Sequence, residues 1–399
     1  MQNTPRANRT HIAIFGKRNS GKSSLINALT GQDIALVSSV LGTTTDPVFK
    51  SMEILPIGPT VVIDTAGLDD EGELGTLRVK KTIQVLNKTD IAIIVIDALV
   101  GFTEFDEGIL RKVESKGIPA IIAVNKVDLA NITIKHDKYP VVNVSSTLLA
   151  GFEELKKVLG EVANVSADKT ILGDLIKPHD IVLLVTPIDS AAPKGRMILP
   201  QQQVVRDILE NDAIVVACKE FELEATLKKL EGKIDLVITD SQAFELVNKL
   251  VPKDIPLTSF SILFARYKGD LNELVRGAKV ISKLKDGAKI LIAEGCTHHK
   301  QKDDIGTVKI PKWLRKYTGL ELEFEHYAGH GYPEGLDKYD LIIHCGACML
   351  NEKEVLHRIE VAVDEKTPIV NYGVLIAYLH GIFDRALTVF PEVLKIYES

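Results

Sequence analysis

The segment Gly16-Lys-Arg-Asn-Ser-Gly-Lys-Ser23 decides the fold of the first part of the chain. It comes directly after an apolar run rich in β-branched residues, His11–Phe15, and it opens a segment of helical periodicity, Lys22–Thr30. The spacing G-x-x-x-x-G-K-S between a strand and a helix is that of a P-loop, in which backbone N–H groups bind phosphate at the helix N-terminus. The segment therefore predicts an α/β domain that binds a nucleotide.

The side chains of this loop have separate expected roles. Lys22 is expected to reach the β- and γ-phosphate oxygens, and Ser23 is expected to ligate Mg²⁺. The predicted phosphate-binding residues are Gly16, Asn19, Ser20, Gly21, Lys22, Ser23 and Ser24.

Three more apolar runs predict further strands of a parallel sheet, at Thr60–Ile63, Ile91–Ile96 and Ala120–Val124. Their near-continuous hydrophobicity is typical of strands that are covered on both faces. The first of them runs into Asp64-Thr-Ala-Gly67. This position places the Asp64 carboxylate beside Mg²⁺ and the Gly67 N–H beside the γ-phosphate.

The base is predicted from two later segments, each at the end of a strand. Asn125-Lys-Val-Asp128 follows the run Ala120–Val124, and Ser145-Ser146 closes the next strand. The Asp128 carboxylate can accept hydrogen bonds from guanine N1 and N2, which adenine does not offer, and a site built for such bonds rejects a base that lacks them. Asn125, Lys126, Asp128, Ser145 and Ser146 therefore predict a guanine site.

A switch segment is expected between the P-loop and Asp64. The sequence Gly42-Thr-Thr-Thr-Asp-Pro47 should supply one threonine to Mg²⁺ when a γ-phosphate is bound. It resembles the G-T-T-x-D pattern of the TrmE/Era/Der-like GTPases, and this resemblance points to Thr44. It implies hydrolysis of GTP to GDP and phosphate, with Lys22, Thr44, Asp64 and Gly67 as catalytic residues.

The attacking water needs a partner in this chain. Leu68 follows Gly67 where Ras-like GTPases carry the glutamine that orients the water. In the TrmE-like branch a potassium ion ligated by a P-loop asparagine serves instead, and Asn19 matches that position. The resemblance thus implies potassium-stimulated turnover. The alternative role for Asn19 is that of a turn residue in left-handed geometry.

A second constellation lies in the last third of the chain. Cys296-Thr-His-His299 follows the predicted strand Lys289–Ala293, and His344-Cys-Gly-Ala-Cys348 follows the predicted strand Leu341–Ile343. Ligand sites of α/β folds lie at the carboxyl ends of strands. Three thiolates with nearby imidazoles suit a zinc site or an iron–sulfur cluster, and C-x-x-C also occurs as a redox dithiol. The residues alone leave these alternatives open.

A TrmE-like GTPase followed by C-x-H and a distant H-C-x-x-C resembles the HydF family, the GTPase and iron–sulfur scaffold proteins of FeFe-hydrogenase maturation. The resemblance covers the whole chain. It implies a 4Fe–4S cluster on Cys296, Cys345 and Cys348, with a variable fourth ligand. It also implies a dimerising middle domain and partnership with two radical-SAM maturases and the hydrogenase.

The fourth ligand has three candidates. His298 and His344 belong to the family motif, although a histidine beside a cysteine turn is often only a hydrogen-bonding neighbour of the ligands. Asp189 follows the predicted strand Ile181–Thr186 and could reach a cluster across a dimer, unless it is a solvated loop carboxylate. Cys218 lies within an apolar run and is expected to be buried.

Composition limits the other possibilities. The 399 residues carry a net charge of −6, which disfavours nucleic acid as the main partner. The polar N-terminus has no signal-peptide core, and no apolar run is long enough to span a bilayer, so a cytoplasmic protein is expected. An RNA-linked GTPase with a structural zinc is the main alternative function, and a redox-sensing GTPase is another.

Alternating strands and helices continue to the end of the chain. We therefore expect a P-loop GTPase domain over residues 1–168, a middle α/β domain over 177–265 and a cluster-binding α/β domain over 266–399. Further strands are predicted at Ala213–Cys218, Ile234–Ile238, Glu321–Glu325 and Thr367–Asn371.

Overall fold

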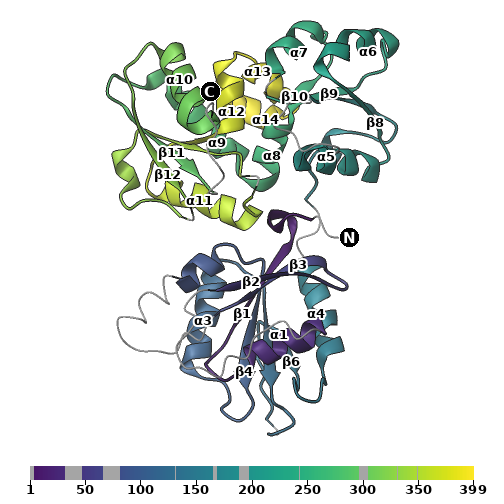
Figure 1. Ribbon diagram of the computed structural model, residues 1–399, viewed down its shortest axis with the longest axis vertical. Coiled ribbons are helices and arrows are strands. Elements are labelled where there is room, and N and C mark those ends of the chain that lie inside the picture. The colour runs from purple at the N-terminus through teal and green to yellow at the C-terminus, as the bar shows by residue number, and fades with distance from the viewer. Residues whose placement is uncertain are drawn as a thin grey trace. The chain divides into compact units, whose positions relative to one another are not determined.

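The computed structural model describes residues 4–31, 47–65, 81–130, 132–164, 169–187, 197–241, 243–295, 304–329, 331–347 and 349–399. The chain forms two compact units, Met1–Asp168 and Lys169–Ser399 (Figure 1). Some predicted site residues lie outside the described residues, namely Thr44, Gly67, Asp189, Cys296, His298 and Cys348.

The first unit is built on a six-stranded sheet of order β2-β3-β1-β4-β5-β6. All neighbouring strands are parallel except β2 and β3, so the predicted parallel sheet is confirmed with one antiparallel edge strand added. The strands are β1 (Thr10–Phe15), β2 (Val48–Ile54), β3 (Gly58–Asp64), β4 (Ile91–Asp97), β5 (Ala120–Asn125) and β6 (Val141–Asn143).

Helices cover both faces of this sheet. Apolar side chains of α1 (Lys22–Thr30) and α4 (Phe152–Asn164) pack with Ile12 and Ile14 on one face. Apolar side chains of α3 (Glu104–Ser115) pack on the other face with Phe15 and with the strand residues that point to that face. Because both faces are covered, the central strands are almost wholly buried. A short 3₁₀ turn, η1 (Arg6–Asn8), precedes β1.

The second unit begins with a four-stranded parallel sheet of order β10-β9-β7-β8. Its strands are β7 (Ile181–Val185), β8 (Ile214–Cys218), β9 (Leu236–Thr239) and β10 (Leu257–Ser259), and its helices are α5 (Leu199–Glu210), α6 (Leu223–Lys229) and α7 (Phe244–Leu250), with 3₁₀ turns η2 (Gly173–Leu175) and η3 (Glu220–Glu222). The prediction that Cys218 is buried is wrong. The residue is only half-buried, because β8 is an edge strand with a neighbour on one side.

A second four-stranded parallel sheet follows, of order β12-β11-β13-β14. Its strands are β11 (Lys289–Glu294), β12 (Glu323–Ala328), β13 (Leu341–His344) and β14 (Ile369–Asn371). The helices of this part are α8 (Phe260–Lys268), α9 (Leu271–Val280), α10 (Ile310–Thr318), α11 (Glu352–Asp364), α12 (Tyr372–Leu379), α13 (Phe383–Leu387) and α14 (Pro391–Glu398), with short turns η4 (Ile281–Lys283), η5 (Ile305–Lys309) and η6 (Leu336–Lys338).

The two sheets of the second unit share one hydrophobic core. A single cluster of buried side chains includes Leu184 of β7, Leu263 of α8 and Ile292 of β11. The contact is reinforced by Arg385 of α13, whose guanidinium donates hydrogen bonds to backbone carbonyls at the end of α7, including Val251 O at 3.1 Å. Helix α8 therefore lies between the sheets and contributes side chains to their shared core. Within the described part of the chain, no helix is long and apolar enough to cross a membrane.

Candidate functional site

The P-loop connects β1 to α1 in the first unit. Gly21 adopts a left-handed conformation with φ of 90°, and a Cβ atom there would lie 2.2 Å from Asn125 Nδ2. A side chain at Gly16 would lie 2.5 Å from Val95 O. Both positions need glycine, since the loop packs directly on the ends of β4 and β5. Asn19 is also left-handed, with φ of 64°, as its alternative role as a turn residue requires.

The predicted phosphate and metal ligands lie together at this loop. Lys22 Nζ is buried inside it and donates hydrogen bonds to Gly16 O at 2.7 Å and Lys17 O at 2.8 Å. Ser23 Oγ lies 3.2 Å from Asp64 Oδ2, so a hydroxyl and a carboxylate meet as a shared Mg²⁺ site requires. Burial raises the pKa of Asp64 above its usual value, and the Lys22 ammonium opposes that shift.

The base-reading segments meet beside the P-loop. Asn125 Nδ2 donates to Ser20 O at 3.0 Å, and Asn125 Oδ1 accepts from the backbone and hydroxyl of Ser146 at 3.1 and 3.0 Å. The hydroxyl of buried Ser145 donates to Asp128 Oδ1 at 2.6 Å. Asp128 itself is exposed. Asn125 thus ties the base segments to the phosphate loop.

Asp97 is a further residue of this site that the sequence analysis missed. It ends β4, and its Oδ2 accepts a 2.6 Å hydrogen bond from Lys126 Nζ. Lys126 also donates to Asn19 O at 2.7 Å. The signal was available, because Asp97 follows an apolar strand in the same way as Asp64 does.

The residues at which the two cysteine segments begin follow the carboxyl ends of β11 and β13, the central strands of the second parallel sheet in the second unit. Strands β11 and β13 pair in parallel with Ala293 opposite His344, so Gly295 and Cys345 leave the sheet side by side. Cys345 N donates to Ala293 O at 3.0 Å, and Gly295 N donates to Cys345 Sγ at 3.3 Å. Cys296 is bonded directly to Gly295. The fold therefore brings Gly295 and Cys345 together at the carboxyl ends of neighbouring strands.

His344 is held on both sides of its ring. Nδ1 donates to Cys345 O at 2.7 Å, and Nε2 lies 2.8 Å from the Arg358 guanidinium, which can only donate. Burial, with the Arg358 charge, lowers the pKa of His344 to about 3. The ring is therefore neutral, and in this arrangement neither nitrogen has a lone pair free for a metal.

Arg358 of α11 was not expected at this site. The residue is 2% exposed. Its guanidinium donates to Gly329 O at 3.0 Å and to Gly331 O, both after β12, and lies 4.9 Å from the Tyr332 ring centre. It therefore joins the segment after β12 to His344 and the Cys345 turn.

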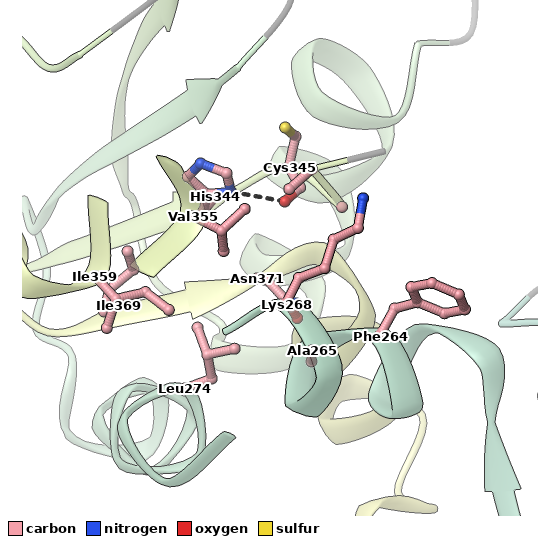
Figure 2. Close-up of a pocket in the computed structure, with 12 residues that line it drawn as sticks. Phe264, Ala265, Lys268, Leu274, His344, Cys345, Val355, Ile359, Ile369 and Asn371 are labelled. Carbon is pink, nitrogen blue, oxygen red and sulfur yellow. Dashed lines mark hydrogen bonds between the residues drawn. The ribbon is translucent and has the colours of Figure 1, made fainter. Parts of the chain in front are cut away.

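A cavity of about 20 Å³ lies beneath Cys345 (Figure 2). Its lining includes His344 and Cys345 from the end of β13, Lys268 from α8 and Asn371 from β14. Glu294, the last residue of β11, accepts a 3.1 Å hydrogen bond at Oε1 from the Tyr372 hydroxyl. Among the residues that the structure describes, no three His, Cys, Asp or Glu side chains gather as a metal site. Cys296 and Cys348 are outside that set, so this finding does not test the predicted three-cysteine site.

Three family models match the chain. The model of the hydrogen maturase F tetramerization domain matches residues 272–389, and that of the hydrogen maturase F dimerization domain matches residues 171–269. The model of the 50S ribosome-binding GTPase matches residues 11–126.

Individual relatives match the first unit. GTPase Der of Sulfurimonas denitrificans is 42% identical over 128 residues, which are 31% of this chain and 26% of that protein. The tRNA modification GTPase MnmE of Chromobacterium violaceum is 34% identical over 160 residues, which are 39% of this chain and 35% of that protein. The chain thus spans only 26% and 35% of the length of these curated relatives. Among solved structures, the G domain of the T. maritima FeoB iron transporter is 28% identical with a TM-score of 0.31, over 39% of this chain and 99% of that one.

Proposed function

Because the chain belongs to the hydrogen maturase F family, whose dimerization and tetramerization domain models together match residues 171–269 and 272–389, we propose that it is a GTPase and iron–sulfur scaffold in the assembly of the FeFe-hydrogenase active site. The RNA-linked alternative is not favoured, since the model named for ribosome binding matches residues 11–126 alone and the tRNA modification GTPase MnmE matches 39% of this chain.

The proposed GTPase activity is supported by two sets of hydrogen-bonded residues, those that read the base and those of the P-loop. Hydrogen bonds join the base-reading residues Asn125, Asp128 and Ser145 to each other's segments and to the P-loop. In that loop the Lys22 ammonium points toward the loop carbonyls. We propose that Lys22 and the P-loop N–H groups bind the phosphates of GTP, and that Gly67 N–H contacts the γ-phosphate attacked by water. Mg²⁺, held by Ser23, Asp64 and Thr44, would neutralise charge on the β- and γ-phosphates.

The scaffold role is supported by the contact between Gly295, which precedes Cys296, and Cys345; the two residues follow the neighbouring strands β11 and β13. A 4Fe–4S cluster fits the donor set of Cys296, Cys345 and Cys348, and the Gly295 N–H directed at Cys345 Sγ is the kind of hydrogen bond that cluster sulfurs accept. When bound, such a cluster with three cysteine ligands supplies one iron that can take an exchangeable ligand. His298 and Asp189 remain candidates for that ligand, while His344 is assigned here to holding the Cys345 turn.

The family also suggests its partners and assembly. The names of the two matching domains support a homodimer or a higher homo-oligomer. We propose that the protein works in the cytoplasm with two radical-SAM maturases and the FeFe hydrogenase.

The cluster is tested with Cys345→Ser. After reconstitution with iron and sulfide under anaerobic conditions, the wild type should bind about four iron atoms per chain and give a 4Fe–4S EPR signal when reduced. The variant should lose that signal, since a serine hydroxyl is a poor replacement for a thiolate ligand. Cys218→Ser is the matched control and should keep the signal, because Cys218 lies on β8 and not among the proposed cluster ligands. Burial also raises the pKa of its thiol, which disfavours the thiolate form that binds metal. One zinc per chain with no cluster uptake would instead indicate a structural zinc site.

Potassium dependence is tested by comparing phosphate release in potassium and sodium chloride at equal ionic strength. Because Leu68 cannot orient water, we expect hydrolysis to be roughly 10-fold faster in potassium, a smaller gain than that of an arginine finger. Asn19→Ala should remove the difference between the salts while GTP binding persists. Equal rates of the wild type in both salts would show that Asn19 is only a turn residue.

A further inference from the structure

A buried lysine faces the Cys345 turn from a helix outside the cysteine-bearing sheet. Lys268 is the last residue of α8, and only 7% of its surface is exposed. Its ammonium donates a hydrogen bond to Leu350 O at 3.1 Å. Leu350 ends the segment that begins with Cys345 and contains Cys348. Lys268 therefore contacts the far end of the segment that carries two of the three cysteines.

Lys268 and Cys345 also share a cavity. Both line the same space of about 20 Å³, which has room for about one water molecule. Figure 2 shows the Lys268 side chain running from α8 toward the segment that carries Cys345. Groups that line so small a cavity lie close together across it, so the positive charge of Lys268 acts on whatever is bound at Cys345.

The buried charge of Lys268 also has an electrostatic effect on what is bound beside it. Three thiolates with a 4Fe–4S core form an anionic group, and reduction adds further negative charge. A fixed cation beside such a group stabilises it, and stabilises the reduced form most, because the attraction grows with the negative charge and is strong in a medium of low dielectric constant.

We propose that Lys268 is a positioning residue for the anionic group bound through Cys345: its ammonium anchors the segment Cys345–Leu350 and supplies a fixed positive charge to the site. The inference rests on the proposed function, because it presupposes a group bound by the cysteines. A role in folding alone would require the hydrogen bond to Leu350 O but no electrostatic effect on that group.

Three variants of the full-length protein separate these roles. Lys268→Met removes both the charge and the hydrogen bond, whereas Lys268→Arg keeps both. Lys279→Met is the matched control, because Lys279 Nζ also donates to a backbone carbonyl, Ile396 O at 3.1 Å, and Lys279 does not line the cavity. Each protein is reconstituted with iron and sulfide without oxygen. Iron per chain is measured first, and the midpoint potential is then measured by EPR-monitored titration with dithionite.

We expect Lys268→Met to shift the midpoint potential to a more negative value and to lower iron uptake at least about twofold, since the reduced, more anionic cluster loses a nearby positive charge. Lys268→Arg and Lys279→Met should match the wild type in both measurements. Thermal unfolding of each apo protein reports whether the fold is kept. If Lys268→Met does not fold, Lys268→Gln, which retains a donor without the charge, replaces it with the same expected shift.

The other outcomes overturn the inference in distinguishable ways. A wild-type protein that takes up no cluster refutes the proposed scaffold function, and the role of Lys268 is refuted with it. Normal cluster content with an unchanged potential in Lys268→Met refutes the role of Lys268 alone. Equal losses in Lys268→Met and Lys268→Arg would show that packing, not charge, matters at this position.

Discussion

Replacing Lys22 with alanine is expected to slow GTP hydrolysis by about 10³-fold, the upper effect of removing one group that stabilises transition-state charge. The reason lies in its position. Lys22 Nζ is buried in the loop and is held by Gly16 O and Lys17 O, so its charge is in place before a nucleotide arrives. Such a preorganised charge needs no reorganisation during the reaction, which makes its loss costly.

The measurement is phosphate release at saturating GTP and Mg²⁺, with the nucleotide affinity determined separately. Lys17→Ala is the control: it removes an equal charge from the same loop but leaves the Lys17 carbonyl that accepts from Lys22. It should change the rate less than about threefold, since the charge of this partly exposed side chain is screened by salt. If Lys22→Ala hydrolysed GTP within tenfold of the wild type, Lys22 would serve binding and not catalysis.

The nucleotide site was largely predictable because local sequence determines it. Helix α1 begins and ends at the predicted residues, since left-handed glycines, Gly21 and Gly31, flank it on both sides. The strand ends that carry Asp64 and Asn125 follow apolar runs, and parallel strands bring such ends to one edge of the sheet. Asp97 also follows an apolar run, but it lies outside the four motifs from which the site was predicted.

Short or one-sided elements were not predictable in the same way. Strand β10 has three residues, too few to show a period, so the predicted three-strand middle sheet lacked it. Strand β2 is partly exposed along an edge, and its mixed sequence has no continuous apolar run. In both cases the pairing is decided by tertiary contacts and not by local propensity.

The surroundings of Cys345 show where sequence reasoning ends. The cysteines were identified by their spacing, but Arg358 and Lys268 lie on helices, where a charged residue is usually interpreted as solvent-facing. Only the packing of α8 and α11 against the sheet reveals that both are buried. His344 belongs to the motif, yet its role depends on Arg358, a partner 14 residues away.

Asp128→Asn is expected to lower the affinity for GTP by about 10²- to 10⁴-fold, because each of two charge-assisted hydrogen bonds contributes about 1.5–3 kcal/mol. The Ser145 hydroxyl fixes Asp128 Oδ1 at 2.6 Å, so the carboxylate is oriented before the base binds. Asparagine offers a single acceptor, and its NH₂ group faces a guanine donor. One donor of the base then keeps only a neutral acceptor, and the other is opposed by the NH₂ group.

A measurement of GTP affinity by itself would be ambiguous, since a disturbed loop around the base would also lower that affinity. Xanthine resolves the ambiguity, because it carries a carbonyl oxygen where guanine carries N2. The asparagine NH₂ can donate to that oxygen, so the affinity of Asp128→Asn for xanthosine triphosphate should rise while that for GTP falls. Titration with both fluorescent nucleotides measures this exchange, and Asp137→Asn, an exposed residue in the same unit, should leave both affinities unchanged. Equal losses for the two nucleotides would mean that Asp128 supports the loop without reading the base.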